Sequence, residues 1–486
     1  MAARDATLSP TLIGTETIRE RNEERYDDDD QSRRPAESKT AVSVTVRFAP
    51  SPTGLLHVGN ARVALLNRLF ADSLGGRFIL RLDDTDAGRS KEEYVTAIKR
   101  DLSWLGIGWE HMVQQSERLT CYDAAMARLQ AAGRVYPCYE TAGELEEQRQ
   151  FQRVQKQPPL YDRAALRLSM TDRMCLESKG CRPHWRFRLN PHDVQWEDLL
   201  RGSCFCRGMH LCDPVLLRAD GSYLYMLTSV VDDIDLNVTH VVRGEDHITN
   251  TAIQVQIFRA LHATAPCFAH LPLMRDMRGQ SLSKRLGSLS LDSLRLQGIE
   301  PMALASLLAT MGTTRQGSVQ STLGELAATF DLQDYGRRGT PRFDETELWH
   351  MNARLLQEAP FETVHNRLIA LGLAEVTEGF WNAVRANLDR LETACIWWRI
   401  CTESLVSKVV DAKFCALAAD LLPPEPWDKA TWSLWVSALK TTTGRTGSAL
   451  FRPLRLTLTG QDSGPELRDL LPVMGRHRVL ERLLQV

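Results

Sequence analysis

A candidate phosphate-binding junction lies at residues 44–70, where a strand pattern gives way to a helix pattern. Apolar and polar residues alternate over 44–49, a Pro-Ser-Pro-Thr-Gly loop follows at 50–54, and apolar residues recur at helical spacing from Asn60. This order brings backbone N–H groups and the positive end of a helix dipole to the mouth of a sheet, where a phosphate chain can settle. His57 and Asn60 fall on the first helical turn and add side-chain donors there. Since many α/β domains have such junctions and bind nothing, this stretch alone leaves a binding role and a structural role equally open.

A second candidate stretch, residues 281–289, places a basic pair among small residues. Lys284 and Arg285 are flanked by serines and a glycine, a composition that suits a mobile loop closing over phosphates. A Ser-Lys-Arg tripeptide alone is a weak signal, so its interest comes from its combination with the first stretch.

Together the two stretches resemble the ATP-binding signatures of class I aminoacyl-tRNA synthetases. Three further motifs narrow the resemblance to glutamyl-tRNA synthetases of the bacterial type: RFAPSPTG at 47–54, LRLDDTD at 80–86 and VVDDIDLNVTHVVRGEDHITNT at 230–251. The resemblance, which runs from about residue 44 to the C-terminus, implies an AMP-forming glutamate–tRNA ligase that makes glutamyl-adenylate from L-glutamate and ATP. It also implies transfer to the 3′-terminal adenosine of tRNA(Glu), Mg²⁺ bound with ATP, a monomer, and tRNA binding before efficient activation. Whether tRNA(Gln) is a second substrate stays open.

The resemblance assigns residues of this chain to three roles. The expected catalytic residues are His57, Asn60 and Lys284. The expected ATP-binding residues are Pro50, Ser51, Gly54, His57, Gly59, Asn60, Glu245, Asp246, Leu282, Ser283, Lys284 and Arg285. The expected glutamate-binding residues are Arg47, Ala49, Ser51, Asp83, Tyr225 and Arg243, with the two arginines offering planar two-donor forks to carboxylates and Asp83 meeting the ammonium.

Three positions depart from the family pattern. Asn60 stands where the first signature usually has a second histidine, a change that the family tolerates. Ser281 replaces a lysine, which leaves Lys284 as the main phosphate ligand of its loop. Asp83 replaces the commoner glutamate, so reaching the substrate ammonium requires a strand shift or a bridging water. The competing structural interpretations are a surface arginine at position 47 and a helix-capping turn that begins at Asp83.

Two cysteine-containing regions were weighed as metal sites, and we expect zinc in neither. Cys204, Cys206, His210 and Cys212 are spaced more tightly than the separated Cys pairs of structural zinc sites. Some relatives carry zinc with ligands near Cys138 and Tyr161. Here no Cys or His follows in residues 161–166, which predicts that this zinc site is absent.

Composition sets limits on the class of protein. The chain has 486 residues, a formal net charge of −2 and no apolar run near the roughly 20 residues that span a bilayer. No apolar core of a signal peptide begins it, and its 11 cysteines are scattered, so we expect a cytoplasmic protein with reduced thiols and no membrane partner. Residues 440–486 contain eight Lys or Arg and four Asp or Glu, 8 − 4 = +4, which makes this end the basic one.

The elements that must position these residues follow βαβ order and then become helical. We predict strands at 44–49, 77–82, 185–189, 215–217, 223–231, 239–243 and 271–274. We predict helices at 60–73, 91–105, 120–132, 247–262, 302–312, 345–356, 361–371, 377–391 and 393–407. The expected fold class is α/β, with a Rossmann-like doubly wound parallel sheet, an α+β insertion and an all-α C-terminal anticodon-binding region.

The expected segments follow from this pattern and from the resemblance. They are a disordered N-terminal extension (1–42), the first half of the catalytic domain (43–135), an acceptor-stem-binding insertion (136–222), the second half of the catalytic domain (223–275), a connecting helical region with the Ser-Lys-Arg loop (276–340) and an α-helical anticodon-binding domain (341–486).

Two rival functions were considered. A shortened relative that glutamylates a modified tRNA base lacks the helical half seen here at 341–486. An inactive tRNA-binding paralogue has only Ser281 and Asp83 in its favour, against intact His57, Lys284 and the two arginines.

Overall fold

The computed structural model describes residues 43–280, 289–336, 339–404 and 411–484, and Ser43–Val486 form one compact unit. The predicted disordered extension at 1–42 and the basic loop at 281–288 lie outside the described residues. Within the described ranges, no helix is both long and apolar enough to cross a membrane.

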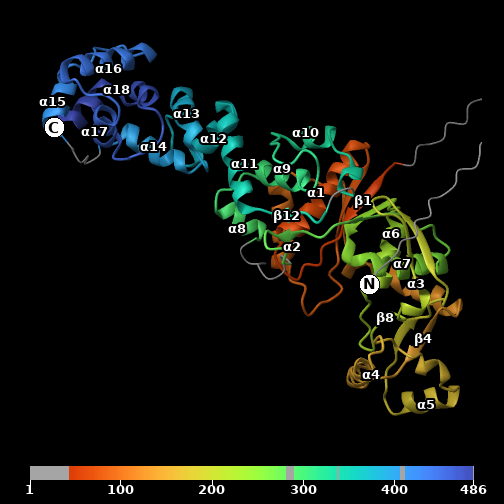
Figure 1. The fold of residues 1–486 in the computed structure, drawn as a ribbon. Helices are drawn as coiled ribbons and strands as arrows, with labels where there is room; N and C mark the ends of the chain where they lie inside the picture. Colours follow the sequence, from red (N-terminus) through yellow and green to blue (C-terminus); the bar gives the residue numbers. More distant parts are fainter. Residues whose placement is uncertain (1–42, 281–288, 337–338, 405–410, 485–486) are drawn as a thin grey trace, which may run out of the picture. The chain divides into compact units, whose positions relative to one another are not determined.

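A parallel sheet carries the strand–loop–helix stretch predicted at residues 44–70 (Figure 1). β1 (Thr45–Phe48) pairs with β2 (Arg77–Leu82), and β2 pairs with β3 (His111–Gln114). The connections are the helices α1 (Val58–Ser73) and α2 (Glu92–Trp104). All four residues of β1 are buried, because α1 packs on this strand and a strand of the second sheet lies at its other edge.

The second sheet has the strand order β7-β6-β10-β9. Its strands are β6 (Val194–Asp198), β7 (Gly202–Cys206), β9 (His240–Gly244) and β10 (Cys267–Leu271), all parallel to their neighbours except β7. The helices α6 (Tyr225–Asp235) and α7 (Ile248–Ala260) lie beside this sheet. The backbone N–H of Thr239 donates to the carbonyl oxygen of Thr45 (2.9 Å), which joins β9 to β1. The carboxyl ends of β1 and β9 therefore open on the same edge, where ligands of such sheets bind.

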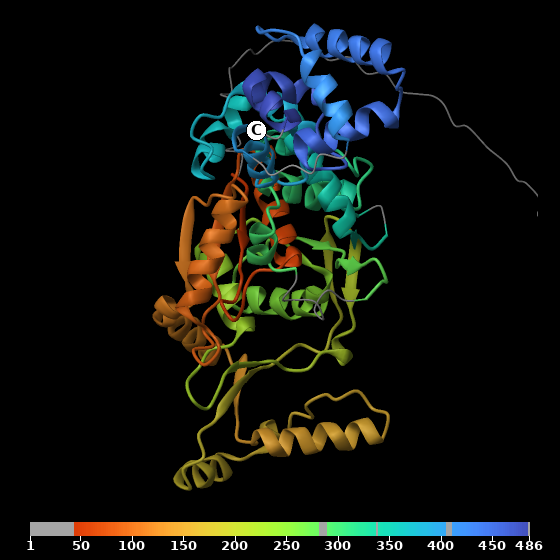
Figure 2. The ribbon, with the colours of Figure 1, turned by 90° about the vertical axis from the view of Figure 1, so that its left-hand side faces the viewer.

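A separate antiparallel sheet of order β4-β5-β8 lies within the expected insertion. It consists of β4 (Val135–Cys138), β5 (His184–Phe187) and β8 (Val215–Leu217), and Figure 2 shows α4 (Ala142–Val154) and α5 (Met170–Ser178) beyond its end. The helix α3 (Leu119–Ala131) leads into it. However, β6 and β7 also lie in the expected insertion, and β6 pairs with β10, so the second sheet draws strands from two expected segments. The segment boundaries stay a prediction.

The chain after residue 290 is almost wholly helical. A short parallel pair, β11 (Arg275–Asp276) with β12 (Arg342–Phe343), brackets its first part. Trp381, Trp397 and Trp435 are buried in the core of the last helices. The helices are α8 (Leu291–Leu296), α9 (Pro301–Thr310), α10 (Leu323–Ala328), α11 (Glu345–Glu358), α12 (Phe361–Ala370), α13 (Glu378–Val384), α14 (Thr393–Thr402), α15 (Ala412–Asp420), α16 (Lys429–Thr443), α17 (Ser448–Thr459) and α18 (Leu467–Leu484).

The α/β class with a helical C-terminal region is confirmed, but three predicted elements are wrong. Residues 225–231 belong to helix α6 (Tyr225–Asp235) and not to a strand: the predicted stretch contains no charged residue, so its helical period shows only when Asp232, Asp233 and Asp235 are included. The strand predicted at 271–274 ends, as β10, at Leu271. The helix predicted at 377–391 stops at Val384 and continues as a short 3-10 helix, Arg385–Asn387.

Candidate active site

A cavity of about 710 Å³ opens at the carboxyl ends of β1 and β9. All six residues expected to bind glutamate line it: Arg47, Ala49, Ser51, Asp83, Tyr225 and Arg243. Of the residues expected to bind ATP, it is lined by Pro50, Ser51, His57, Gly59, Asn60 and Asp246. Gly54 and Glu245 do not line the cavity, and Leu282, Ser283, Lys284 and Arg285 lie outside the described residues. Two sets of residues that were predicted from separate motifs therefore share one cavity.

His57 caps the N-terminus of α1, and this contact determines which ring nitrogen of His57 carries the proton. The backbone N–H of Gly59 donates to Nδ1 of the imidazole (2.9 Å), so the neutral ring carries its proton on Nε2. Burial lowers the pKa of His57, which favours this neutral form. The backbone N–H of His57 in turn donates to Oδ1 of Asn60 (3.3 Å), which completes a capping box.

The capping box engages only acceptor atoms of the two side chains, Nδ1 of His57 and Oδ1 of Asn60. Nε2–H of His57 and the amide N–H₂ of Asn60 have no hydrogen-bond acceptor among the described residues. Both side chains line the cavity at the N-terminus of a 16-residue helix, where the dipole and the free backbone N–H groups favour an anion. This end of the cavity is therefore built to receive phosphate oxygens.

Gly59 is required by the position of the His57 ring. A Cβ at residue 59 would lie 2.6 Å from Cε1 and 2.8 Å from Nδ1 of that imidazole, closer than such atoms approach. Any larger residue would push the ring away from its cap. The glycine therefore serves the orientation of His57.

Arg47 is one of the buried arginines that line the cavity. Its Nε donates to Oδ1 of Asp233 (3.3 Å), and within the described part of the chain its two terminal nitrogens have no acceptor. The side chain is buried and lies at the carboxyl end of β1. A buried fork with both terminal nitrogens free can bind a carboxylate through two parallel hydrogen bonds.

Arg243 is held much more tightly than Arg47. Nη1 donates to the hydroxyl of Tyr225 (2.9 Å), and Nη2 donates to Oγ1 of Thr251 (2.6 Å) and Oε1 of Gln254 (2.7 Å). Nε points at Nε2 of His270 (3.5 Å). Of its five N–H groups, the one that remains on Nη1 has no acceptor among the described residues, so Arg243 can give a ligand a single, rigidly placed hydrogen bond.

Asp83 faces the cavity but is already ion-paired. Its two oxygens accept from Nε (2.7 Å) and Nη2 (3.2 Å) of Arg81, which is fully buried on the same face of β2. Burial raises the pKa of the Asp83 carboxyl to about 6 against the opposing attraction of Arg81. Nη1 of Arg81 also donates to Asp233 (2.7 Å), so Asp233 holds Arg81 and Arg47 together.

Several residues of the site were not predicted. Arg81 could have been found, because residues two apart on a strand share a face and Asp83 was already a candidate. Arg62 also lines the cavity and gave no separate signal within its helix. It donates to the carbonyl oxygens of Pro272 (3.2 Å) and Met311 (3.4 Å), and burial lowers its pKa to about 10. None of the described carboxylates forms an ion pair with it, so it adds positive charge to the wall of the cavity.

Glu245 lies beside the cavity and acts on its rim. Its carboxylate is ion-paired with Arg201 and accepts from the backbone N–H of Leu273 (3.1 Å), which lines the cavity. Asp246 follows it and lines the cavity directly. The predicted contact of Glu245 with ATP stays a prediction.

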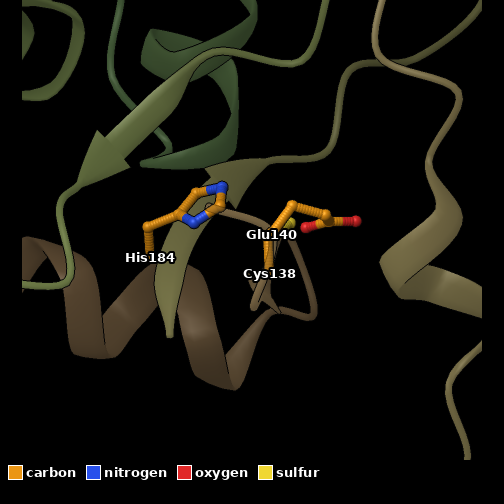
Figure 3. Close-up of side chains that lie close together, drawn as sticks. All are labelled: Cys138, Glu140 and His184. Carbon is orange, nitrogen blue, oxygen red and sulfur yellow. The ribbon is translucent and has the colours of Figure 1, made fainter. Parts of the chain in front are cut away.

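A different group of potential metal ligands lies in the β4-β5-β8 sheet. Cys138, Glu140 and His184 bring their ligand atoms within 4.8 Å of one another, and Figure 3 shows the three side chains gathered around one point. Cys138 and His184 are paired partners on the antiparallel strands β4 and β5. No sequence signal indicated His184, because it lies 46 positions after Cys138 and reaches it only through the pairing of β4 with β5. Cys204, Cys206, His210 and Cys212 do not form such a group, since Cys138, Glu140 and His184 are the one set found in the described part of the chain.

The cluster is also connected without a metal. The hydroxyl of Tyr161 donates to Oε1 of Glu140 (2.6 Å), and the guanidinium of Arg186 lies 4.3 Å from the centroid of the Tyr161 ring. Burial raises the pKa of the Cys138 thiol to about 12, which opposes the thiolate form that zinc requires. Nε2 of His184 and Oε2 of Glu140 are nevertheless buried without a hydrogen-bond partner among the described residues, so these contacts do not decide between a core and a metal centre, and the absence of zinc stays a prediction.

The chain matches known proteins and two family models over most of its length. A family model described as tRNA synthetases class I (E and Q), catalytic domain, matches residues 43–349, and a model described as an anticodon binding domain matches residues 408–486. The chain is 54% identical over 443 residues to glutamate–tRNA ligase 2 of Methylobacterium sp. (strain 4-46), covering 91% of this chain and 99% of that protein. It is 53% identical over 443 residues to the glutamate–tRNA ligase of Azospirillum brasilense, with the same coverage of each.

Solved structures agree with the fold. The crystal structure of a glutamate tRNA ligase from Elizabethkingia meningosepticum CCUG26117 in complex with its amino acid has a TM-score of 0.80 with this chain. The match covers 91% of this chain and 99% of that one at 23% identity, so it supports the architecture alone. The catalytic-domain model spans more than half of the chain and the curated relatives match almost their whole length to it. The chain therefore belongs to the class I tRNA synthetases (E and Q).

Proposed function

We propose that this protein is a glutamate–tRNA ligase, which activates L-glutamate with ATP and transfers it to the 3′-terminal adenosine of tRNA(Glu). The observation that carries the proposal is the shared cavity, in which two arginines and Asp83 lie opposite the donors of a helix N-terminus. The names of the relatives, which are identical to this chain at about half of its positions, support the same activity.

The arginines suit a substrate with two carboxylates. The free terminal nitrogens of Arg47 would hold one carboxylate through a two-donor fork, and the remaining N–H of Arg243 would orient the other. Asp83 would accept from the ammonium group, with Tyr225 and Ser51 completing the pocket. Its ion pair with Arg81 fixes the carboxylate in place, and a bridging water would span the gap left by a side chain one methylene shorter than the usual glutamate.

The chemical step is attack of the substrate carboxylate on the α-phosphorus of ATP, which releases pyrophosphate. Such an in-line displacement depends on positioning and charge neutralisation more than on a nucleophilic side chain. Nε2–H of His57 and the amide of Asn60 would donate to phosphate oxygens as negative charge develops on them. Lys284 would add a positive charge beside the phosphates, and Mg²⁺ would enter with the nucleotide.

The rival functions fit less well. The chain matches an anticodon binding domain at residues 408–486, a part that a shortened enzyme glutamylating a modified base would lack. An inactive paralogue does not need the donors on His57 and Arg47 that have no acceptor among the described residues. We further propose a cytoplasmic monomer without zinc, whose expected insertion at 136–222 holds the tRNA acceptor end. The use of tRNA(Gln) is left to experiment.

The test is aminoacylation of tRNA(Glu) and tRNA(Gln) transcripts with labelled glutamate, together with ATP–pyrophosphate exchange in the presence and absence of tRNA. The intact chain is compared with Lys284→Ala, and with Lys99→Ala on α2 as a matched loss of one lysine. Charging of tRNA(Glu), lost in Lys284→Ala but not in Lys99→Ala, supports the proposal. If the intact chain charges neither tRNA, the inactive-paralogue interpretation replaces it.

A further inference from the structure

A continuous row of buried polar groups runs from the end of β6 to Arg243. Asp198 is the last residue of β6, His270 lies next to it on β10, and His270 is the register partner of Arg243 on β9. The Asp198, His270 and Arg243 side chains are all buried. Because the three strands are parallel neighbours, their carboxyl ends stack these side chains beneath the cavity floor.

The hydrogen bonds of His270 define which atom carries its proton. Nδ1 lies 2.5 Å from Oδ2 of Asp198, so Nδ1 is the donor. Nε2 lies 2.8 Å from Oγ1 of Thr251 and 3.5 Å from Nε of Arg243. Both of those groups can donate, and therefore Nε2 of a neutral ring accepts. A proton on Nε2 would instead point at the guanidinium of Arg243.

Thr251 transmits this arrangement to the arginine. Its Oγ1 accepts from Nη2 of Arg243 (2.6 Å). Its one proton has two acceptors in reach, Nε2 of His270 at 2.8 Å and the carbonyl oxygen of His247 at 3.3 Å, and the shorter contact is the one to His270. Gln254, one helical turn further along α7, accepts from the same Nη2 (2.7 Å) and donates through Nε2 to the hydroxyl of Ser229 (2.7 Å). The bonds to Tyr225, Thr251 and Gln254 fix the plane of the guanidinium, and the ring of His270 contacts both Thr251 and Nε of Arg243.

Asp198 ties this row to the turn that follows β6. Its Oδ1 accepts from the backbone N–H groups of Leu200 (3.0 Å) and Arg201 (3.1 Å), while Oδ2 faces His270. Burial opposes ionisation of Asp198, but its bonds to His270 and to the backbone lower the pKa of the carboxyl, so it is charged when the row is intact. One carboxylate thus fixes both the β6–β7 turn and the histidine tautomer.

We propose that His270 and Asp198 are positioning residues for Arg243, which set how the single free N–H of that guanidinium meets a carboxylate of the amino-acid substrate. The inference rests on the proposed function. It also links the segment expected to hold the tRNA acceptor end, which contributes Asp198, to the amino-acid pocket. His270 does not reach the substrate, since Thr251 and the guanidinium lie between them.

The experiment compares two substitutions that separate the two bonds of His270. His270→Asn keeps a donor near the place of Nδ1 for Asp198 but has no atom in reach of Thr251, whereas His270→Gln keeps an acceptor near the place of Nε2. We expect His270→Asn to raise KM for glutamate about tenfold, the effect of one hydrogen bond to a charged group, while KM for ATP stays within about twofold. We expect His270→Gln to recover most of this loss.

A matched control and a double variant complete the test. His240→Asn changes a half-buried histidine of the adjacent strand β9 that bonds Thr239, and we expect it to leave both KM values unchanged. Thr251→Val removes the hydroxyl between ring and guanidinium, so its effect on KM for glutamate should not add to that of His270→Asn. Melting temperatures are measured on every variant.

The outcomes separate the inference from the proposed function. If the intact chain does not charge tRNA(Glu), the proposed function fails. If the intact chain is active but His270→Asn leaves KM for glutamate within twofold, or raises KM for ATP and glutamate equally, the positioning role is wrong and His270 is only part of the core. If His270→Asn does not fold, Thr251→Val decides alone, and an unchanged KM for glutamate overturns the inference.

Discussion

Replacing Arg47 by lysine keeps a positive charge at the cavity but removes the planar fork. Within the described residues, the terminal nitrogens of Arg47 have no acceptor and only Nε is engaged, by Asp233. An ammonium group at this position has the charge but cannot offer two parallel donors to one carboxylate. At least one charge-assisted hydrogen bond to the substrate is lost in Arg47→Lys.

The size of the effect follows from that lost bond. A hydrogen bond to a charged group contributes about 1.5–3 kcal/mol, and each 1.4 kcal/mol is tenfold in affinity. We therefore expect KM for glutamate to rise by about 10- to 150-fold, whereas KM for ATP changes less than about twofold. The folded state should lose little, because Nη1 of Arg81 still pairs with Asp233 (2.7 Å) and no buried carboxylate is left alone.

The assay is ATP–pyrophosphate exchange with saturating tRNA, in which glutamate and ATP are varied separately. Arg77→Lys on β2 is the matched control, since this exposed arginine donates to Oγ1 of Thr45 (3.1 Å) and does not line the cavity. Arg243→Lys should behave differently from both, because it strands the buried acceptors Thr251 and Gln254 and so lowers the melting temperature as well. A KM for glutamate that stays within twofold in Arg47→Lys would refute the two-donor reasoning.

Three further predictions concern other parts of the molecule. Because the pKa of Asp83 is raised to about 6, its carboxylate becomes neutral as the pH falls through 6. KM for glutamate should therefore rise on acidification in wild type, and Asp83→Asn should lose this pH dependence. A flat pH profile of KM in wild type would contradict the role of Asp83 in ammonium binding. Gly59→Ala should displace the His57 ring and lower kcat at least tenfold. Gly108→Ala, which has open space around the new Cβ, should have the kcat of wild type. An equal kcat in Gly59→Ala and Gly108→Ala would show that the position of the His57 ring is unimportant. Elemental analysis should find no stoichiometric zinc, and one zinc per chain that disappears in His184→Ala would overturn that expectation.

Local sequence signals were sufficient for the phosphate side of the site. These signals lie within about 15 residues of chain: the Pro-Gly loop, the glycine at position 59 and the helical spacing after Asn60. The strand β1 and the helix α1 form as predicted. The glutamate-binding residues, by contrast, came from the family resemblance. Arg47 and Arg243 are 196 positions apart, and their meeting depends on the β1–β9 neighbourhood that no local period encodes.

The support beneath the site could not be predicted, since it depends on strand order. Asp198 and His270 are separated by 72 residues and meet only because β6 lies beside β10. His184 joins Cys138 for the same reason, through the antiparallel pairing of β4 with β5. The helix α6 was predicted as a strand because the stretch 223–231 has no charged residue, and the aspartates that mark the helical period begin at Asp232. Hydrophobic periodicity in a sequence distinguishes solvent-facing from buried positions, and it does not indicate which buried residues of different strands contact one another.

The capping box at α1 has a consequence for motion. The same imidazole nitrogen that holds the amide of Gly59 also keeps Nε2–H turned toward the cavity, so fraying of the first helical turn and loss of that donor are one event. A nucleotide that accepts a hydrogen bond from Nε2–H of His57 must therefore stabilise the bond between the Gly59 N–H and Nδ1 of the same ring. Hydrogen exchange at the Gly59 amide then becomes a readout of nucleotide occupancy that is independent of catalytic turnover.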